Sequence, residues 1–201
     1  MNLDLALSPH FTLRELVRSE TAERVAALRE QQRNPPEEVV AALSGLATRC
    51  LEPLRLDVGV PLHVNSGYRS KALNQRVGGA KTSQHRLGLA ADLVPVLPTP
   101  AAEMSFRERV AAEMAAQTGL VLRASVSGPG LVFAWVVLHL EAFDIDQVIH
   151  EYGEGPGRPA WLHVSSRPND GRRQILRYHL GQDGRVQVAK MGAKTALGLC
   201  S

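Results

Sequence analysis

Cysteine is scarce in this chain of 201 residues, which has only Cys50 and Cys200. The two lie far apart and form no Cys-x-x-Cys pair, so a zinc–thiolate site, a redox pair and a disulfide framework are all disfavoured. Aromatic residues contribute 4% of the chain, although 44% of it is hydrophobic. Valine, leucine and alanine therefore have to fill most of the core.

Long apolar segments are lacking as well. The longest run, from Leu131 to Leu140, includes His139 and is too short to span a bilayer. Residues 1–6 have neither the basic region nor the apolar core of a secretory signal peptide. The sequence therefore predicts no membrane insertion and a protein that is cytoplasmic when it is made.

A strong charge bias is also missing, since 23 Lys and Arg residues against 20 Asp and Glu residues give a net charge of +3. The arginines are scattered and not clustered with aromatic residues, which argues against a nucleic-acid-binding protein. The chain is long enough for one well-buried domain and short for two, and it has no internal repeat or linker. We therefore expect residues 1–201 to form a single domain.

Local patterns predict a mixture of helices and strands. Thr12 and Glu15 form a capping box that starts a short helix at Leu13. Further helices are expected over about residues 37–58, 70–77 and 105–118. Strands are expected near residues 62–64, 89–95, 120–126, 146–152, 161–166, 174–180 and 184–190. Ser127 to Gly130 predict a turn, and the small, polar tail at 191–201 is expected to be loose.

A histidine and an aspartate seven positions apart form the most informative stretch. His85 follows Ser83-Gln84 in an expected loop, and Asp92 lies in the strand after it. A third candidate, His163, stands in Trp161-Leu162-His163-Val164-Ser165, which alternates like a strand. Imidazole and carboxylate both bind divalent metals, and catalytic zinc takes three protein ligands plus water. The competing interpretation is that these are three unrelated polar residues.

More of a pattern lies upstream, in Ser66-Gly67-Tyr68-Arg69-Ser70 and in Val77-Gly78-Gly79-Ala80. With these segments the chain resembles the zinc peptidase family of D-Ala-D-Ala carboxypeptidases and phage peptidoglycan endopeptidases. That family has a Ser-Gly-Tyr-Arg-Ser box, a Ser-x-His-x6-Asp box and a late Trp-x-His box. The resemblance covers about residues 10–177, although residues 97–130 carry no motif that supports it.

The resemblance implies an α+β fold of the hedgehog/DD-peptidase type: a small, mainly antiparallel sheet with helices on one side and the metal on its open face. It implies one Zn²⁺ per chain, held by His85, Asp92 and His163. It also implies hydrolysis of peptide bonds in the stem peptides or cross-links of bacterial peptidoglycan. Carboxypeptidase and endopeptidase members share these boxes, so the sequence leaves open which bond is cut.

Three residues near the boxes are expected to bind substrate: Arg69, Ser83 and Tyr68. The planar guanidinium of Arg69 can grip a carboxylate or an amide oxygen that gains charge, which also makes Arg69 a candidate catalytic residue. The alternative is a surface arginine in a salt bridge. Ser83 is expected to contact Asp92 or substrate, or to cap the turn. Tyr68 is expected to pack beside the metal loop.

The general base departs from the simplest family form. Many members carry a glutamate three residues before the last histidine ligand, where this chain has Ala160. Glu151 closes a segment, residues 146–151, that resembles the strand before the last metal box in phage-type members. We therefore expect Glu151 to be the base. The alternative is that Glu151 only orients a ligand and that Glu154 or Asp146 is the base.

The missing export signal and the resemblance together suggest an endolysin-type, bacteriolytic protein. Another factor would open the membrane, and the enzyme would then act on the cell wall as a monomer. Two other classes remain: a non-catalytic peptidoglycan-binding module, and a structural phage component that keeps the fold. A plausible general base argues against the binding module, whereas only an activity assay separates the structural component.

Overall fold

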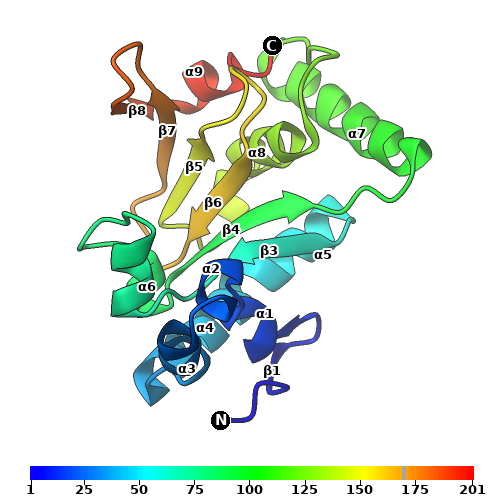
Figure 1. Ribbon diagram of the computed structural model, residues 1–201. Helices are drawn as coiled ribbons and strands as arrows, with labels where there is room; N and C mark the ends of the chain where they lie inside the picture. Colours follow the sequence, from blue (N-terminus) through cyan, green and yellow to red (C-terminus); the bar gives the residue numbers. More distant parts are fainter. Residues whose placement is uncertain (169–170) are drawn as a thin grey trace.

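The computed structural model describes residues 1–168 and 171–201, in which six strands form one twisted sheet (Figure 1). The strands run in the order β3-β4-β6-β5-β7-β8, and β5 and β7 are parallel whereas the other neighbouring pairs are antiparallel. Their bounds are β3 Leu62–Ser66, β4 Ala90–Pro95, β5 Gln147–Glu151, β6 Trp161–Ser165, β7 Gln174–Leu180 and β8 Val186–Met191. The expected mainly antiparallel sheet is confirmed.

The N-terminal part of the chain is a helical region preceded by a two-stranded hairpin. Its elements are β1 Ala6–Ser8, β2 Phe11–Thr12, α1 Leu13–Val17, α2 Glu20–Glu23, α3 Ala26–Arg33, α4 Glu37–Leu46, a π-helical turn Ala47–Leu51 and α5 Glu52–Val58. Thr12 and Glu15 make the predicted capping box. The π-helical turn ends two residues before Pro53. Proline lacks the N–H that a continuous α-helix would direct to the carbonyl of Arg49.

Helices cover one face of the sheet. The central one is α8 Gly128–Leu138, which contacts β4, β5 and β6 and is buried from Gly130 to Val137. It is flanked by α5, by α7 Pro100–Thr118 and by α9 Ala193–Leu197, with the 3-10 helix Leu140–Ala142 after it. Burial on all sides explains why the sequence of α8 has no periodicity.

The opposite face of the sheet is open. It is bordered by α6 Lys71–Arg76, which Ser70 caps, and by the 3-10 helix Gln84–Leu87. The candidate site lies on this face. The fold is therefore α+β, with helices packed on one side of the sheet, as the family resemblance implied.

Three local expectations were wrong. Residues 120–126 form no strand, because the Arg123 N–H donates to the carbonyl of Cys200 and not to a sheet. Ser127 to Gly130 do not form an isolated turn, because Ser127 caps α8. The tail at 191–201 is not loose, since β8 extends to Met191 and α9 packs on α8.

The helices also bear on the expectation of no membrane insertion. Among residues 1–168 and 171–201, no helix combines the length and the apolar character that crossing a bilayer requires.

Candidate metal centre and substrate pocket

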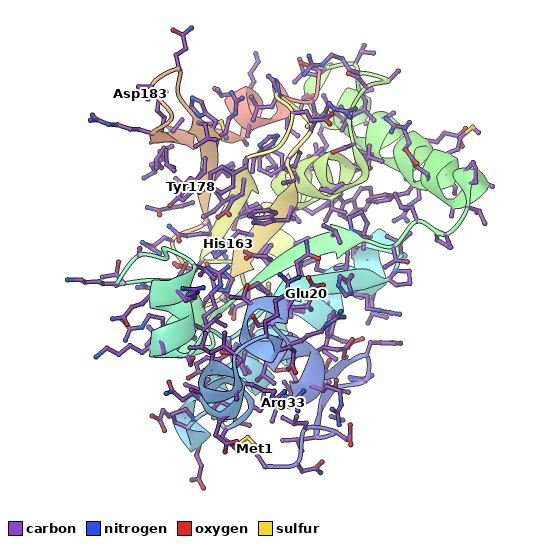
Figure 2. The ribbon with its side chains drawn as sticks, viewed as in Figure 1. Met1, Glu20, Arg33, His163, Tyr178 and Asp183 are labelled. Atoms are coloured by element: carbon purple, nitrogen blue, oxygen red, sulfur yellow. The ribbon has the colours of Figure 1, made fainter. Side chains whose placement is uncertain are left out.

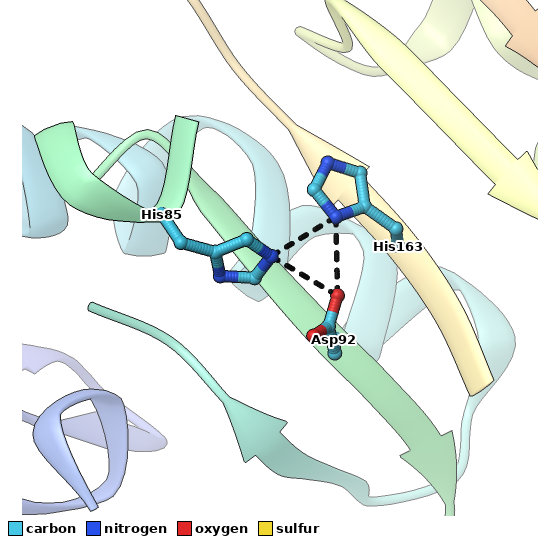
Figure 3. Close-up of side chains that lie close together, drawn as sticks. All are labelled: His85, Asp92 and His163. Carbon is cyan, nitrogen blue, oxygen red and sulfur yellow. Dashed lines mark hydrogen bonds and ion pairs between the residues drawn. The ribbon is translucent and has the colours of Figure 1, made fainter. Parts of the chain in front are cut away.

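Three buried side chains meet on the open face of the sheet (Figure 3). Asp92 on β4 lies directly opposite His163 on β6, so the strand register places the two side by side. His85 comes from the 3-10 helix before β4, and Gly88, with a φ of 69°, turns the chain back into that strand. The structure thus brings together the three residues that the sequence singled out.

The donor atoms of this group form a nearly equilateral triangle. His85 Nε2 and His163 Nδ1 are 3.1 Å apart, and they lie 3.2 and 3.1 Å from Asp92 Oδ1. Ligands about 2.0–2.1 Å from a tetrahedral zinc ion lie about 3.3 Å from one another. The triangle therefore fits a zinc-sized ion with three protein ligands and one open position.

Backbone contacts orient His85 for such a role. Its Nδ1 lies 2.7 Å from the carbonyl of Gly67, which makes Nδ1 the protonated nitrogen and leaves the Nε2 lone pair facing Asp92. Gly67 can make this contact because the chain passes very close to α1: a Cβ at this position would lie 2.3 Å from the carbonyl oxygen of Leu16. The Ser-Gly-Tyr-Arg-Ser box thus supports the metal loop through its backbone.

Asp92 is held in its ionised form. Burial acts to raise its pKa, but the neighbouring imidazoles of His85 and His163 outweigh burial and hold the pKa well below its usual range. Its second oxygen, Oδ2, accepts a hydrogen bond of 2.6 Å from Arg69 Nη2. Oδ1 is therefore the oxygen left to face the two histidines.

Arg69 forms an ion pair with Asp92, and this pair is largely buried. Its side chain is 20% exposed and lines the pocket. Besides Asp92, it donates from Nε to Ser66 Oγ over 2.8 Å. One edge of the guanidinium is thus occupied, and Nη1 is the nitrogen for which no hydrogen bond is found within the described residues.

Glu151 lies on the same open face as the metal group. Ile149 pairs with His163 across β5 and β6, and Glu151, two residues further along β5, pairs with Trp161. The Trp161 indole donates to Glu151 Oε2 over 2.8 Å. Burial, and next the negative charge of Asp92, raise the pKa of Glu151 above its ordinary value. A raised carboxyl pKa suits a group that accepts and returns a proton.

The two alternative bases are less well placed. Glu154 is exposed and pairs with Arg158 over 2.9 Å. Asp146 is fully buried and accepts hydrogen bonds from Arg172 and from Gln84. Burial opposes ionisation of Asp146, but Arg172 outweighs burial and lowers its pKa to about 2. Neither carboxylate lines the pocket.

A pocket of about 1050 Å³ surrounds the metal group. Ser83 lines it but makes no hydrogen bond to Asp92 and no capping hydrogen bond within the described residues. Tyr68 is not among the residues that line it, and its side chain belongs to the hydrophobic core, so substrate binding by Tyr68 stays a prediction. Three aromatic residues do line the pocket: Trp161 belongs to the Trp-x-His box, whereas Tyr152 and Tyr178 had no motif to mark them.

A family model described as peptidase M15 matches residues 9–123, which is more than half of the chain. The matched segment contains Arg69, His85 and Asp92 and ends before Glu151 and His163. No curated protein matches the chain.

Proposed function

This chain belongs to the peptidase M15 family, and from that premise we propose that it is a zinc metallopeptidase acting on bacterial peptidoglycan. It would hydrolyse peptide bonds in the stem peptides or cross-links. The observation that carries this proposal is the triangle of His85, Asp92 and His163 in a pocket that also holds Glu151. A zinc ion held by the three side chains would activate water and polarise the scissile carbonyl.

Glu151 is assigned the proton transfers. Its carboxylate faces the same pocket as the metal group, and burial keeps its pKa raised, so it can take a proton from the attacking water. The same carboxyl group then returns this proton to the leaving amine. The Trp161 indole holds Oε2, which leaves Oε1 to exchange the proton.

Arg69 is assigned two tasks. Its Nε and Nη2 fix Ser66 and the outer oxygen of Asp92, so it positions a metal ligand. Nη1 would stabilise the substrate oxygen that gains negative charge during the reaction. Ser83, which lines the pocket, is assigned to substrate binding.

We place this activity in phage-type lysis, with a monomeric enzyme that reaches the wall after another factor has opened the membrane. The position of Glu151 beside the metal group argues against a non-catalytic wall-binding module. A structural phage component remains the competing function, and it would show no turnover.

Digestion of purified sacculi tests the proposal. Zinc-loaded protein should release new amino termini that mass spectrometry identifies within stem peptides or cross-links, and metal-stripped protein should release none until zinc is restored. If zinc-loaded protein releases no amine, the structural or binding function replaces the peptidase.

A further inference from the structure

The pocket continues on both sides of the metal group. On one side it is lined by residues 18–21 and by His63 and Asn65 of β3, and on the other by Glu151, Tyr152 and Tyr178. Figure 2 shows Glu20 and Tyr178 on opposite sides of His163. The metal group thus lies in the middle of a trough, not at its end.

The sheet that forms the floor gives the length of this trough. Asp92 and His163 are on adjacent strands, with β3 beyond β4 on one side and β5 and β7 beyond β6 on the other. Neighbouring strands are about 4.8 Å apart, so the floor from β3 to β7 measures roughly 19 Å. An extended peptide rises about 3.3 Å per residue, and the trough therefore holds roughly five to six residues that cross the strands. The volume of about 1050 Å³ is at the upper end of the range for small-molecule pockets.

An enzyme that removes a C-terminal residue needs a cation beside the metal that can bind the terminal carboxylate. Arg69 is the pocket arginine that contacts the metal group, and its Nε and Nη2 already bind Ser66 and Asp92. Arg172 directs the same two nitrogens to Asp146. Arg167 also points to Asp146, with Nε 3.3 Å from Oδ2.

Arg18 lies at the far end of the trough, with Nη2 4.0 Å from Glu20. Arg69, the arginine that contacts the metal group, therefore has only Nη1 left for a chain end, and not the paired N–H donors that bind a carboxylate most strongly.

From the open trough and the occupied Nε and Nη2 of Arg69, we infer that the enzyme cuts an internal peptide bond, with substrate chain on both sides of the metal. This inference rests on the proposed function and narrows it to an endopeptidase. Water adds across one amide bond, so that one fragment gains a carboxylate and the other an amine. Each fragment keeps at least two residues, or a residue and its sugar.

The test uses zinc-loaded full-length protein and cross-linked muropeptides purified from sacculi. Mass spectrometry should find fragment pairs from internal bonds, with no early release of single C-terminal amino acids. In a series of shortened peptides, leaving a single residue on either side of the cut should lower kcat/KM by more than tenfold. Release of terminal residues alone would overturn the inference and leave the peptidase function standing, whereas no cleavage of any wall peptide would overturn both.

A blocking variant tests the β3 side of the trough. Asn65→Trp puts a large side chain on an exposed, pocket-lining position and should lower muropeptide cleavage more than tenfold without changing zinc content. Val188→Trp, at an exposed site on β8 outside the pocket, is the matched control and should leave cleavage unchanged. Unchanged cleavage by a folded Asn65→Trp protein would mean that substrate does not occupy this side, and the inference would fall. Product analysis of the wild type decides the matter if the variant does not fold.

Discussion

Glu151 is the residue on which the proposed chemistry depends most closely. Glu151→Gln keeps the shape of the side chain and an acceptor for the Trp161 indole, but it cannot take a proton. We expect zinc content and folding to stay normal and kcat to fall by about 10²–10⁴-fold. Muropeptide turnover and zinc analysis of the purified variant measure both effects.

The matched control is Glu154→Gln, which changes an exposed glutamate three residues away and should retain wild-type turnover. Substantial activity in Glu151→Gln would remove Glu151 from the proton-transfer role. Loss of zinc in that variant would instead assign Glu151 to orienting a ligand.

His150 is the neighbour of Glu151, but it points to the other face of the sheet, because successive side chains of a strand alternate between the two faces. Its ring packs edge-on against Phe133 of α8, with centroids 5.3 Å apart. Neither ring nitrogen has a hydrogen-bond partner among the described residues. Burial, and next the charge of Arg177, lower the pKa of His150 from 6.5 to about 4. The folded protein therefore holds this histidine neutral.

This lowered pKa predicts a loss of stability in acid. The unfolded chain binds a proton at His150 below about pH 6.5, whereas the folded chain binds it only near pH 4. The folded state is therefore most stable above pH 6.5, where His150 is neutral in both states, and it loses stability as the pH falls toward 4. Between pH 7 and pH 5 the loss is about 2 kcal/mol.

His150→Leu removes this titrating group. Between pH 7 and pH 5 the free energy of unfolding of the variant should therefore fall by about 2 kcal/mol less than that of the wild type. At pH 7 the variant should be at least as stable, because leucine leaves no buried nitrogen without a partner. Urea denaturation at pH 7 and pH 5 measures both. Equal acid sensitivity in the two proteins would contradict the prediction.

At the scale of elements, the sequence predicted what local patterns determine. The capping box at Thr12 and Glu15 and the alternation around His163 were sufficient, because each is complete within a few residues. The metal candidates could be grouped because three motifs occurred together. Their contact depends on the register between β4 and β6, which local sequence patterns do not determine.

The elements that the sequence did not predict depend on distant partners. Residues 120–126 have strand-like composition, but their backbone lies beside Cys200 at the other end of the chain. The network around Asp146 was missed for the same reason, since Gln84 and Arg172 approach it from segments far apart in sequence. The role of Tyr68 depends on the direction of its side chain, which the sequence does not determine, and in the structure this side chain belongs to the hydrophobic core.

The C-terminal helix gives an element-scale prediction. Leu197 of α9 is 2% exposed and belongs to the main core. Leu197→Ala should lower the free energy of unfolding by about 2–4 kcal/mol, because it leaves a cavity beside α8. Lys194→Ala, on the exposed side of the same helix, is the control and should change stability little. Equal effects of the two substitutions in urea denaturation would mean that α9 does not contribute to the core.

Asp146 connects three elements, namely the 3-10 helix that carries His85, the start of β5 and the segment before β7. It accepts from Gln84 over 2.7 Å and from Arg172 Nη2 over 2.6 Å. Asp146→Asn removes the charge, so the metal loop should be held less firmly, and zinc affinity should fall by about 10–100-fold. Competition with a chelator measures this affinity.

The control for Asp146 is Asp144→Asn, which alters a partly exposed carboxylate on the same segment that pairs with Arg49. It should retain wild-type zinc affinity. If both variants bind zinc as the wild type does, the network around Asp146 has no part in holding the metal.

On the scale of the whole molecule, the metal group joins the segment that matches the family model to the segment after it. The family match ends at residue 123, and His163 lies beyond it. One hydrophobic core includes residues from Leu7 to Cys200, which supports the proposal that residues 1–201 form a single domain. A bound metal should therefore stabilise the fold as a whole, since its ligands come from both parts.

The central claim is that His85, Asp92 and His163 together hold one zinc ion, and the zinc content of the purified protein tests it most directly. Mass spectrometry of metal per chain should find about one zinc in the wild type and in the control His179→Ala, whose imidazole lies outside the pocket. His85→Ala, Asp92→Ala and His163→Ala should each lose most of this zinc while they remain folded. Full zinc in all three variants would contradict the account.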